Sequence, residues 1–323
     1  MPIAFEQVGY TYIDPKSRKK KTRKIERGEK AAERGKWGTD PDAIWALRDI
    51  NFTLEDGEFL GICGHTGSGK STLIQHMNGL VHPTEGRVLV DGEDLADKNV
   101  AARVRTRCGM VFQYPEHQLF AATVREDVSF GPHNMGLSAN EIDERVRESL
   151  ADVGLDYDEI AEKSPFELSG GQQRRVAFAG VLAMKPKVLV LDEPVAGLDP
   201  KSRREFLELI SDLHKSGLTV VMVSHNMEDL ASLCTRVLVL KEGRQFMLGT
   251  PAEVFADAAQ LKTVGLAAPA PQALACELRE SGFELARSLY GVETLAQDIA
   301  AELGYLTAAA TKNAPAAEEE NLR

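Results

Sequence analysis

The chain has 323 residues, a formal net charge of −11 and a hydrophobic fraction of 43%, so it is long enough to bury one large core and to carry an appendage. It contains no apolar stretch of about eighteen residues and no charged-then-apolar leader pattern, and we expect neither a membrane-spanning helix nor a signal peptide. The four cysteines are too scattered for a zinc site or a disulfide framework, which predicts reduced thiols.

The first predicted strand carries Tyr10 and Tyr12 at alternating positions, and a basic segment at 15–43 follows it. From Lys16 to Lys36 there are eleven Lys or Arg and three Glu, a local charge of +8 that leaves the rest of the chain near −19. A solvated insertion is the favoured interpretation, with contact to acidic lipid headgroups or an acidic partner as the alternative. Nucleic-acid binding is not expected, because the segment holds one aromatic residue and the remaining chain is acidic.

A glycine-rich loop follows the next apolar run. The loop fits the pattern G-x-x-x-x-G-K-[ST], in which backbone N–H groups wrap phosphates, the lysine reaches the outer phosphates and the hydroxyl holds Mg²⁺. Residues 58–63 before it predict a buried strand, and residues 71–77 after it predict a helix whose N-terminus favours an anion. An ordinary glycine turn is the alternative. We expect ATP to bind at Gly64, His65, Thr66, Gly67, Ser68, Gly69, Lys70, Ser71 and Thr72.

A second glycine-rich turn, Leu168–Gln172, stands before the segment 173–183, which has helical spacing of apolar residues. Such a turn is a second anion-binding nest, with the Ser169 hydroxyl as an extra donor, and a simple helix cap is the alternative. Two phosphate-binding turns can serve one nucleotide only if they come from different subunits. The candidate residues of this turn are Ser169, Gly170, Gly171 and Gln172.

Two further predicted strands end in polar residues. The run 188–191 is continuous and apolar, as in a parallel strand covered on both faces, and it ends in Asp192 and Glu193. Asp192 is predicted to hold Mg²⁺ together with Ser71, and Glu193 to orient and deprotonate the attacking water, with a solvated acidic turn as the alternative. His225 follows another strand-like run, where ligands collect in open α/β sheets, and is a candidate catalytic residue.

The chain changes character after residue 248. From about 249 to 306, apolar residues recur at helical spacing and are interrupted by Pro269 and Pro271, which predicts a small helical module. The range 307–323 is rich in alanine, contains three consecutive Glu residues and reads as a disordered tail. No internal repeat is visible, so a second phosphate-binding unit would have to come from another chain.

Three further motifs complete the set: Gln113 after an apolar run, Gly-Leu-Asp-Pro at 197–200 and Ser-His at 224–225. In combination, these motifs resemble those of the ATP-binding-cassette (ABC) ATPases over roughly residues 1–250. The resemblance implies an α/β P-loop NTPase fold, with an ATPase domain at 1–248 and a helical subdomain at 112–182 inserted into it. It also implies a dimer that sandwiches two ATP molecules, in which the LSGGQ turn closes over the partner chain's nucleotide.

The same resemblance implies roles for single residues. Gln113 would contact Mg²⁺ and sense it together with the transport partner, Asp199 would lie in the loop between the two subunits, and His225 would contact the γ-phosphate. An aromatic residue near the N-terminus would stack on adenine; Tyr12 is preferred to Tyr10, and core packing is the competing explanation for either.

A narrower resemblance lies in the residues around the motifs, at Gly64–Gly67, Val111–Phe120 and Ser164–Gly171. They resemble the ATPases of energy-coupling factor (ECF) transporters, specifically the second of the two paralogous ATPase subunits, which is also related to cobalt-importer ATPases. That family drives uptake of vitamins or transition-metal ions, and it pairs two ATPase subunits with a membrane coupling protein and a substrate-binding membrane protein. The resemblance implies that Tyr114–Phe120 helps to receive the coupling protein's helices; a plain solvent loop is the alternative.

We therefore expect the ATP-hydrolysing subunit of an ECF-type importer, with ATP and Mg²⁺ in its site, held at the cytoplasmic face of the cell membrane by its partners. The expected partner for ATP closure is a second ABC ATPase chain, in a heterodimer, with a homodimer as the alternative. The ATPase of another ABC transporter is one alternative. The other is a soluble ABC ATPase that remodels a nucleic-acid or ribosomal complex, a class that usually joins two cassettes or inserts a long coiled coil, and neither is present.

Overall fold

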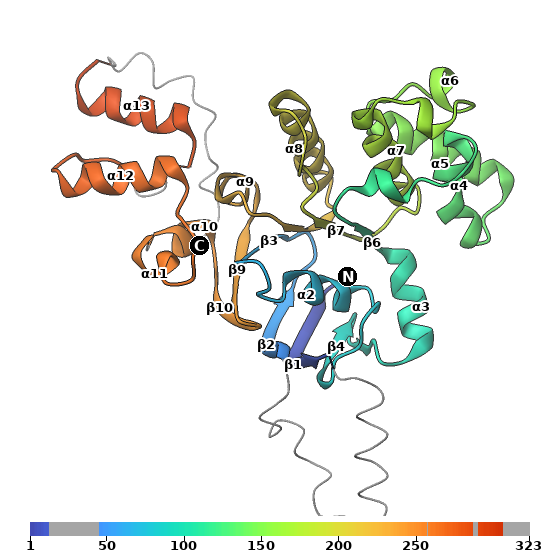
Figure 1. Cartoon of the computed structure of the whole chain (residues 1–323), viewed down its shortest axis with the longest axis horizontal. Helices are drawn as coiled ribbons and strands as arrows, with labels where there is room; N and C mark the ends of the chain where they lie inside the picture. The colour runs from blue at the N-terminus through green and yellow to red at the C-terminus, as the bar shows by residue number, and fades with distance from the viewer. Residues whose placement is uncertain (13–44, 257, 287–289, 306–323) are drawn as a thin grey trace, which may run out of the picture.

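The computed structural model describes residues 1–12, 45–256, 258–286 and 290–305 (Figure 1). The predicted basic insertion at 15–43 and the predicted tail at 307–323 lie outside the described residues. Within the described part, no helix combines the length and the apolar composition that crossing a bilayer requires.

A six-stranded sheet forms the centre of the molecule, with its strands in the order β10-β9-β3-β8-β7-β6 (Figure 1). All neighbouring pairs in it are parallel except β10 with β9. The carboxyl ends of β3, β7 and β8 therefore open at the same edge, which is where ligands bind in open α/β sheets. The strands are β3 (Phe59–Cys63), β6 (Cys108–Val111), β7 (Val188–Asp192), β8 (Thr219–Val223), β9 (Arg236–Lys241) and β10 (Arg244–Gly249).

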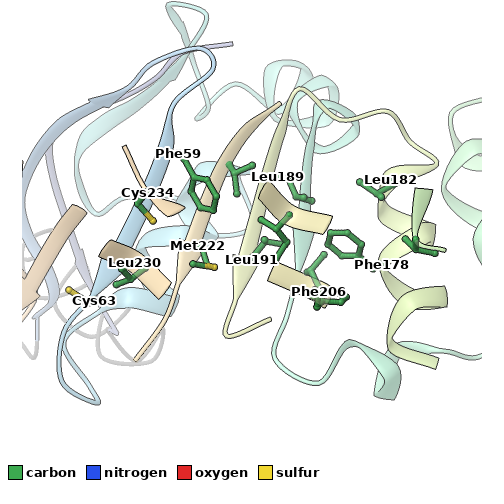
Figure 2. Close-up of a cluster of buried hydrophobic side chains, with 14 of the residues drawn as sticks. Phe59, Cys63, Phe178, Leu182, Leu189, Leu191, Phe206, Met222, Leu230 and Cys234 are labelled. Carbon is green, nitrogen blue, oxygen red and sulfur yellow. The ribbon is translucent and has the colours of Figure 1, made fainter. Parts of the chain in front are cut away.

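Both faces of this sheet are covered, which explains why its strands read as continuous apolar runs. Along β3, Phe59 belongs to one buried cluster, whereas Leu60 and Ile62 belong to the other. Figure 2 shows the first cluster, in which strand residues such as Leu191 pack beside Phe178 of α7 (Gly170–Leu182) and Phe206 of α8 (Pro200–Lys215). The rings of Phe178 and Phe206 lie 5.0 Å apart between centroids, so these two helices share one core.

A four-stranded antiparallel sheet lies beside the second cluster, in the order β2-β1-β4-β5. Its strands are β1 (Ile3–Thr11), β2 (Trp45–Leu54), β4 (Glu85–Val90) and β5 (Glu93–Asp94). Inward residues of this sheet, such as Ile3 and Ile50, share the cluster with Leu73 of α2 (Lys70–Met77). This packing brings the end of β1 and the start of β2 close to the helix that follows the glycine-rich loop.

Helices fill the chain between β6 and β7 and gather to one side of the sheet (Figure 1). Three of them, α4 (Val124–Asn134), α5 (Ala139–Asp152) and α7, start at capping boxes, and such boxes satisfy free N–H groups at a helix start. The boundaries 1–248 and 112–182 for the ATPase domain and its helical subdomain stay predictions. The segments here are η2 (Pro115–Gln118), α4, α5, α6 (Tyr157–Ile160), η3 (Pro165–Glu167) and α7, and α3 (Lys98–Arg107) precedes β6.

The C-terminal helices α12 (Ala270–Glu280) and α13 (Val292–Glu302) lie at the opposite end of the molecule from α4–α7 (Figure 1). They pack on each other around a small cluster of their own, formed by Ala275, Leu285 and Leu295. Pro269 and Pro271 stand at the start of α12, where a proline costs no helix hydrogen bond. The module limits of 249–306 stay a prediction. The remaining helices are α9 (Met227–Leu233), α10 (Pro251–Phe255) and α11 (Ala258–Lys262).

Candidate active site

The glycine-rich loop connects the fully buried strand β3 to helix α2, in the predicted order. Gly69 is the N-cap of α2 with φ +101°, and a Cβ there would lie 2.4 Å from the carbonyl oxygen of Ala46. At Gly64, a Cβ would lie 2.4 Å from the carbonyl oxygen of Leu240. Gly67 has φ +81° but open space around it, so its conformation alone favours glycine there.

Lys70 reaches back over this loop. Its Nζ donates to the carbonyl oxygens of Gly64 at 2.8 Å and His65 at 3.1 Å. Burial lowers the pKa of the Lys70 ammonium, whereas the carboxylates of Glu193 and Asp192 act to raise it. The loop therefore holds a desolvated cation at the place where phosphate oxygens are expected.

A hydroxyl and a carboxylate from distant parts of the chain meet beside the loop. Ser71 Oγ donates to Asp192 Oδ2 at 3.2 Å. Burial raises the pKa of the Asp192 carboxyl, and the Ser71 hydrogen bond and Lys70 oppose this shift. The described residues contain no group of three His, Cys, Asp or Glu side chains that could enclose a metal. One hydroxyl and one carboxylate fit Mg²⁺, which keeps several waters and takes its other ligands from substrate phosphates.

Glu193 lies next to this pair in a strained backbone conformation. Its φ is +51°, a left-handed value that costs a non-glycine residue about 1–3 kcal/mol. Its N–H donates to the carbonyl oxygen of Val223 at 3.1 Å. Its Oε1 is buried and accepts no hydrogen bond from the described residues. Burial, and then the charge of Asp192, raise the pKa of Glu193 to about 7, a value suited to a general base.

His225 stands beside Glu193 at the end of β8. The two side chains approach to 3.3 Å between Nε2 and Oε1, without the geometry of a hydrogen bond. Burial, and then the charge of Lys70, lower the pKa of His225, so the imidazole is neutral at pH 7. About half of its side chain is exposed, which leaves it free to contact a bound molecule.

The two tyrosines have different surroundings. Tyr12 is 66% exposed, and its hydroxyl forms a 3.0 Å hydrogen bond with Thr72 Oγ1. Tyr10 is partly buried, with its ring edge-on to His76 at 5.2 Å and to Tyr12 at 5.1 Å. Tyr12 therefore has the more accessible ring, and its contact with adenine stays a prediction.

These groups surround one cavity of about 540 Å³, a volume in the range of small-molecule sites. It brings together most of the predicted residues: Tyr12, Thr66, Gly67, Gly69, Lys70, Ser71, Thr72, Gln113, Asp192, Glu193 and His225. Three lining residues had not been predicted, namely Ala46, Ala196 and Val223. Ala196 and Val223 lie near predicted site residues in the sequence, whereas no sequence signal marks Ala46.

The second glycine-rich turn does not line this cavity. Ser169 is the N-cap of α7 and forms a capping box with Gln172. None of the residues that the structure describes lies within 4 Å of a Cβ placed on Gly170 or Gly171, so within that part of the chain this turn faces open space. Asp199 is likewise outside the cavity and caps α8, where it accepts from the backbone N–H groups of Lys201 and Ser202. Within this chain both are helix caps, and their roles toward a second chain stay predictions.

The fold and the cavity define a class. A strand, a phosphate-type loop and a helix place a lysine, a hydroxyl and a carboxylate side by side, with a glutamate of raised pKa next to them. This combination is that of a P-loop nucleotide hydrolase.

Comparisons with known proteins narrow the class. A family described as "ABC transporter" matches residues 47–196. The protein named energy-coupling factor transporter ATP-binding protein EcfA2 from Symbiobacterium thermophilum is 55% identical over 307 residues, which covers 95% of this chain and 97% of the relative. A protein of the same name from Clostridium tetani is 50% identical, over 79% of this chain and 89% of the relative.

Solved structures give the same result. The structure of cbiO1 from Clostridium perfringens, described as part of the ABC transporter complex cbiONQ, has a TM-score of 0.65 and 37% identity, covering 81% of this chain and 94% of that one. A dimeric structure of the ATP-binding cassette MJ0796, bound to ADP and Pi, has a TM-score of 0.62 and 29% identity, covering 77% of this chain and 98% of that one. The chain therefore belongs to the EcfA2 family of ECF transporter ATP-binding proteins, which confirms the predicted family and the predicted α/β P-loop fold.

Proposed function

We propose that this chain is the ATP-hydrolysing subunit of an ECF-type importer and couples ATP binding and hydrolysis to uptake of a vitamin or a transition-metal ion through membrane partners. The observation that carries the proposal is the convergence of Lys70, the Ser71–Asp192 pair and Glu193 on one cavity. The names of its relatives supply the transport context. The location that follows from this proposal is the cytoplasmic face of the cell membrane, reached through the partners.

Phosphate binding depends on the loop. Its backbone N–H groups and the positive end of α2 attract the phosphates, and the Lys70 ammonium exchanges its carbonyl partners for phosphate oxygens. Ser71 and Asp192 are the residues that would hold Mg²⁺, with Gln113 nearby on the cavity wall. When bound, Mg²⁺ neutralises charge that develops on the phosphates.

Glu193 is the proposed base for the attacking water. Its buried Oε1 accepts no hydrogen bond from the described residues, so it is available to take one from water. The left-handed backbone conformation of Glu193 is held by its surroundings, and it sets the position from which the carboxylate side chain projects. His225, with a neutral imidazole beside it, is proposed to contact the γ-phosphate.

A second ATPase chain is proposed to complete the site. Ser169 and Gly170 are exposed and lie outside the cavity, so in a dimer their turn would face the nucleotide of the other chain. The dimeric solved relative supports this arrangement. A heterodimer with a paralogous ATPase is our preferred form, and a homodimer is the alternative.

The membrane coupling protein is proposed to dock after Gln113. Phe120 of this segment is 61% exposed, and its ring meets that of Phe130 edge-on at 5.0 Å, on the same helical part of the chain. Contiguous exposed apolar surface is a feature of protein interaction sites, and the two rings contribute to such a surface. The substrate-binding membrane protein would then be reached through the coupling protein.

The test of this function is Glu193→Gln. We expect ATP affinity to stay within about two-fold and turnover to fall about 1000-fold, since a general base contributes a factor of this order. A malachite-green phosphate assay and equilibrium ATP binding would measure the two quantities. Glu242→Gln is a matched control, because Glu242 has a similar φ of +49° but lies outside the cavity. Normal hydrolysis by Glu193→Gln would refute the assignment of the base.

A further inference from the structure

Arg174 is a buried charge near the site that has no role in the proposed function. Arg174 lies on α7, little more than a turn beyond the Ser169 cap, and its side chain is only 4% exposed. A buried cation is unfavourable unless its hydrogen bonds are satisfied, so its partners define why it is there.

All three nitrogens of the Arg174 guanidinium donate hydrogen bonds. Nε and Nη2 donate to the two oxygens of Glu116, at 3.0 Å and 2.8 Å, in the bidentate arrangement that arginine and carboxylate favour. Nη1 donates to the carbonyl oxygens of Ala196 at 2.8 Å and Pro194 at 3.4 Å. A single side chain therefore ties together three separate stretches of chain.

Two of these stretches carry cavity residues. Glu116 lies in η2, just after Gln113, and Gln113 lines the nucleotide cavity. Pro194 and Ala196 lie in the loop that follows Glu193, and Ala196 lines the same cavity. Arg174 itself belongs to the helix that starts at the second glycine-rich turn. The arginine thus connects that helix to the two segments that carry Gln113 and the proposed base.

The loop after Glu193 needs such support. Glu193 adopts a left-handed backbone conformation, and the N–H of Ala196 donates to its carbonyl oxygen at 3.1 Å. Strained residues keep their geometry only where the surroundings fix it. The two hydrogen bonds from Arg174 to Pro194 and Ala196 fix the far side of this turn.

Stability alone is a weak reason for this arrangement. Replacing a buried ion pair by apolar residues is often neutral or stabilising, so a buried pair points to a demand for position. The neighbouring Arg175 offers a contrast, because it donates to the carbonyl oxygen of Val153 and to Glu205, and none of these three residues lines the nucleotide cavity.

We propose that Arg174, anchored by Glu116, is a positioning residue that holds Glu193 in its productive place and sets it relative to the second glycine-rich turn. The inference rests on the proposed ATPase function. The helix α7 begins at the turn that would face the partner chain's nucleotide. A movement of that turn would therefore be transmitted through the Arg174 side chain to Glu193, the proposed base of this chain.

The test uses the full chain together with its ATPase partner chain in the same ATPase assay, with Glu116→Gln and Arg174→Lys as single and double variants. Glu116→Gln keeps the shape of the side chain but loses its charge. Arg174→Lys keeps the charge but loses the planar guanidinium that donates two hydrogen bonds to one carboxylate. We expect each to lower kcat about ten-fold while KM and equilibrium ATP affinity stay within two-fold. The double variant should be no slower than the slower single variant, because both remove the same link.

Arg147→Gln is the control, since Arg147 pairs with Asp143 and stacks on Tyr157 on the same helical side, and among the described residues neither partner lines the cavity. It should leave kcat unchanged. Variants with a lower melting temperature but a wild-type kcat would overturn the proposal, and so would an equal loss of ATP affinity and kcat. If Arg174→Lys fails to fold, Glu116→Gln decides alone. A wild-type chain that has no ATPase activity even together with a second ATPase chain would instead refute the proposed function, and this inference with it.

Discussion

The chain contains two glycine-rich turns at helix N-termini, and their surroundings differ. The loop before α2 is enclosed: Gly64 and Gly69 approach backbone carbonyls, and a lysine covers the loop. The turn before α7 is open, since nothing lies within 4 Å of a Cβ on Gly170 or Gly171. Both offer N–H groups to an anion, but only the first has the cation, the hydroxyl and the carboxylates around it. The difference indicates that one turn builds a pocket within the chain, whereas the other is open, as its proposed contact with a second chain requires.

The largest expected effect tests the enclosed loop. Lys70→Met should lower ATP affinity on the order of 1000-fold, because a desolvated ammonium makes strong charge-assisted hydrogen bonds to phosphate. Isothermal titration calorimetry with Mg-ATP would measure it. Lys215→Met is the control, since Lys215 is exposed on α8 and pairs with Asp212. If Lys70→Met bound ATP with wild-type affinity, Lys70 would not contribute to ATP binding, and it would not distinguish the enclosed loop from the open turn.

The next effect tests the open turn. Gly170→Val should fold normally, because its Cβ enters open space, and should bind ATP with an affinity within two-fold of wild type. Its kcat should fall about 100-fold, since the side chain would cover the N–H groups that meet the partner's phosphates. Gly180→Ala, farther along α7 with its nearest atom at 3.9 Å, is the matched control. Equal loss of ATP affinity in Gly170→Val would mean that the turn belongs to this chain's own pocket.

A third prediction concerns the Glu193 carboxyl of the enclosed site and its effect on how stability depends on pH. The folded, metal-free chain keeps the Glu193 proton up to about pH 7, whereas the unfolded chain releases it near 4.5. Raising the pH through this window therefore lowers stability, and the loss is complete above pH 7. Glu193→Gln should be more stable than wild type by about 3 kcal/mol at pH 8, which is the free energy of the pKa shift. Urea unfolding at pH 8 and pH 5 would measure it; a difference that does not shrink at pH 5 would contradict the raised pKa.

The smallest expected effect tests which of the two tyrosines contributes to ATP binding. Tyr12→Ala should weaken ATP binding about ten-fold, because stacking of a base on an aromatic ring contributes about 1–3 kcal/mol. Tyr10→Phe should change the affinity less than two-fold, since Tyr10 does not line the cavity and contacts it only through the ring of Tyr12 among the described residues. Fluorescence titration with ATP and with GTP would report both affinity and base preference. A larger loss of ATP affinity in Tyr10→Phe than in Tyr12→Ala would mean that Tyr10, not Tyr12, contacts the base.

The sequence predicted the enclosed loop closely. The helix predicted at 71–77 is Lys70–Met77, and the strand before it is Phe59–Cys63, because loop, strand and helix signals are contiguous and local. The ends of β7 and β8 followed from the same rule for parallel strands. Local signals did not decide between the tyrosines: alternation treats Tyr10 and Tyr12 alike, but β1 ends at Thr11, and only Tyr12 reaches Thr72.

Other parts of the site depend on contacts between distant residues. Ala46 walls the pocket because β2 runs past Gly69 in space, and nothing in its own segment signals this. Arg174 and Glu116 are 58 positions apart, and each alone reads as an ordinary surface charge. Only the packing of α7 against η2 and the loop after Glu193 brings them together. The fold class was therefore readable from the sequence, whereas the support around the base was not.

The carbonyl oxygens that hold Lys70 also bear on how easily nucleotide leaves. An ammonium that lost its phosphate partners in a dry pocket would stand alone, and product departure would be slow for that reason. Here Gly64 and His65 provide such replacement acceptors, so in the proposed cycle the loop would compete with the phosphates for the ammonium. Such competition would limit how tightly the product nucleotide is retained, which an ATPase that must release it after every cycle requires.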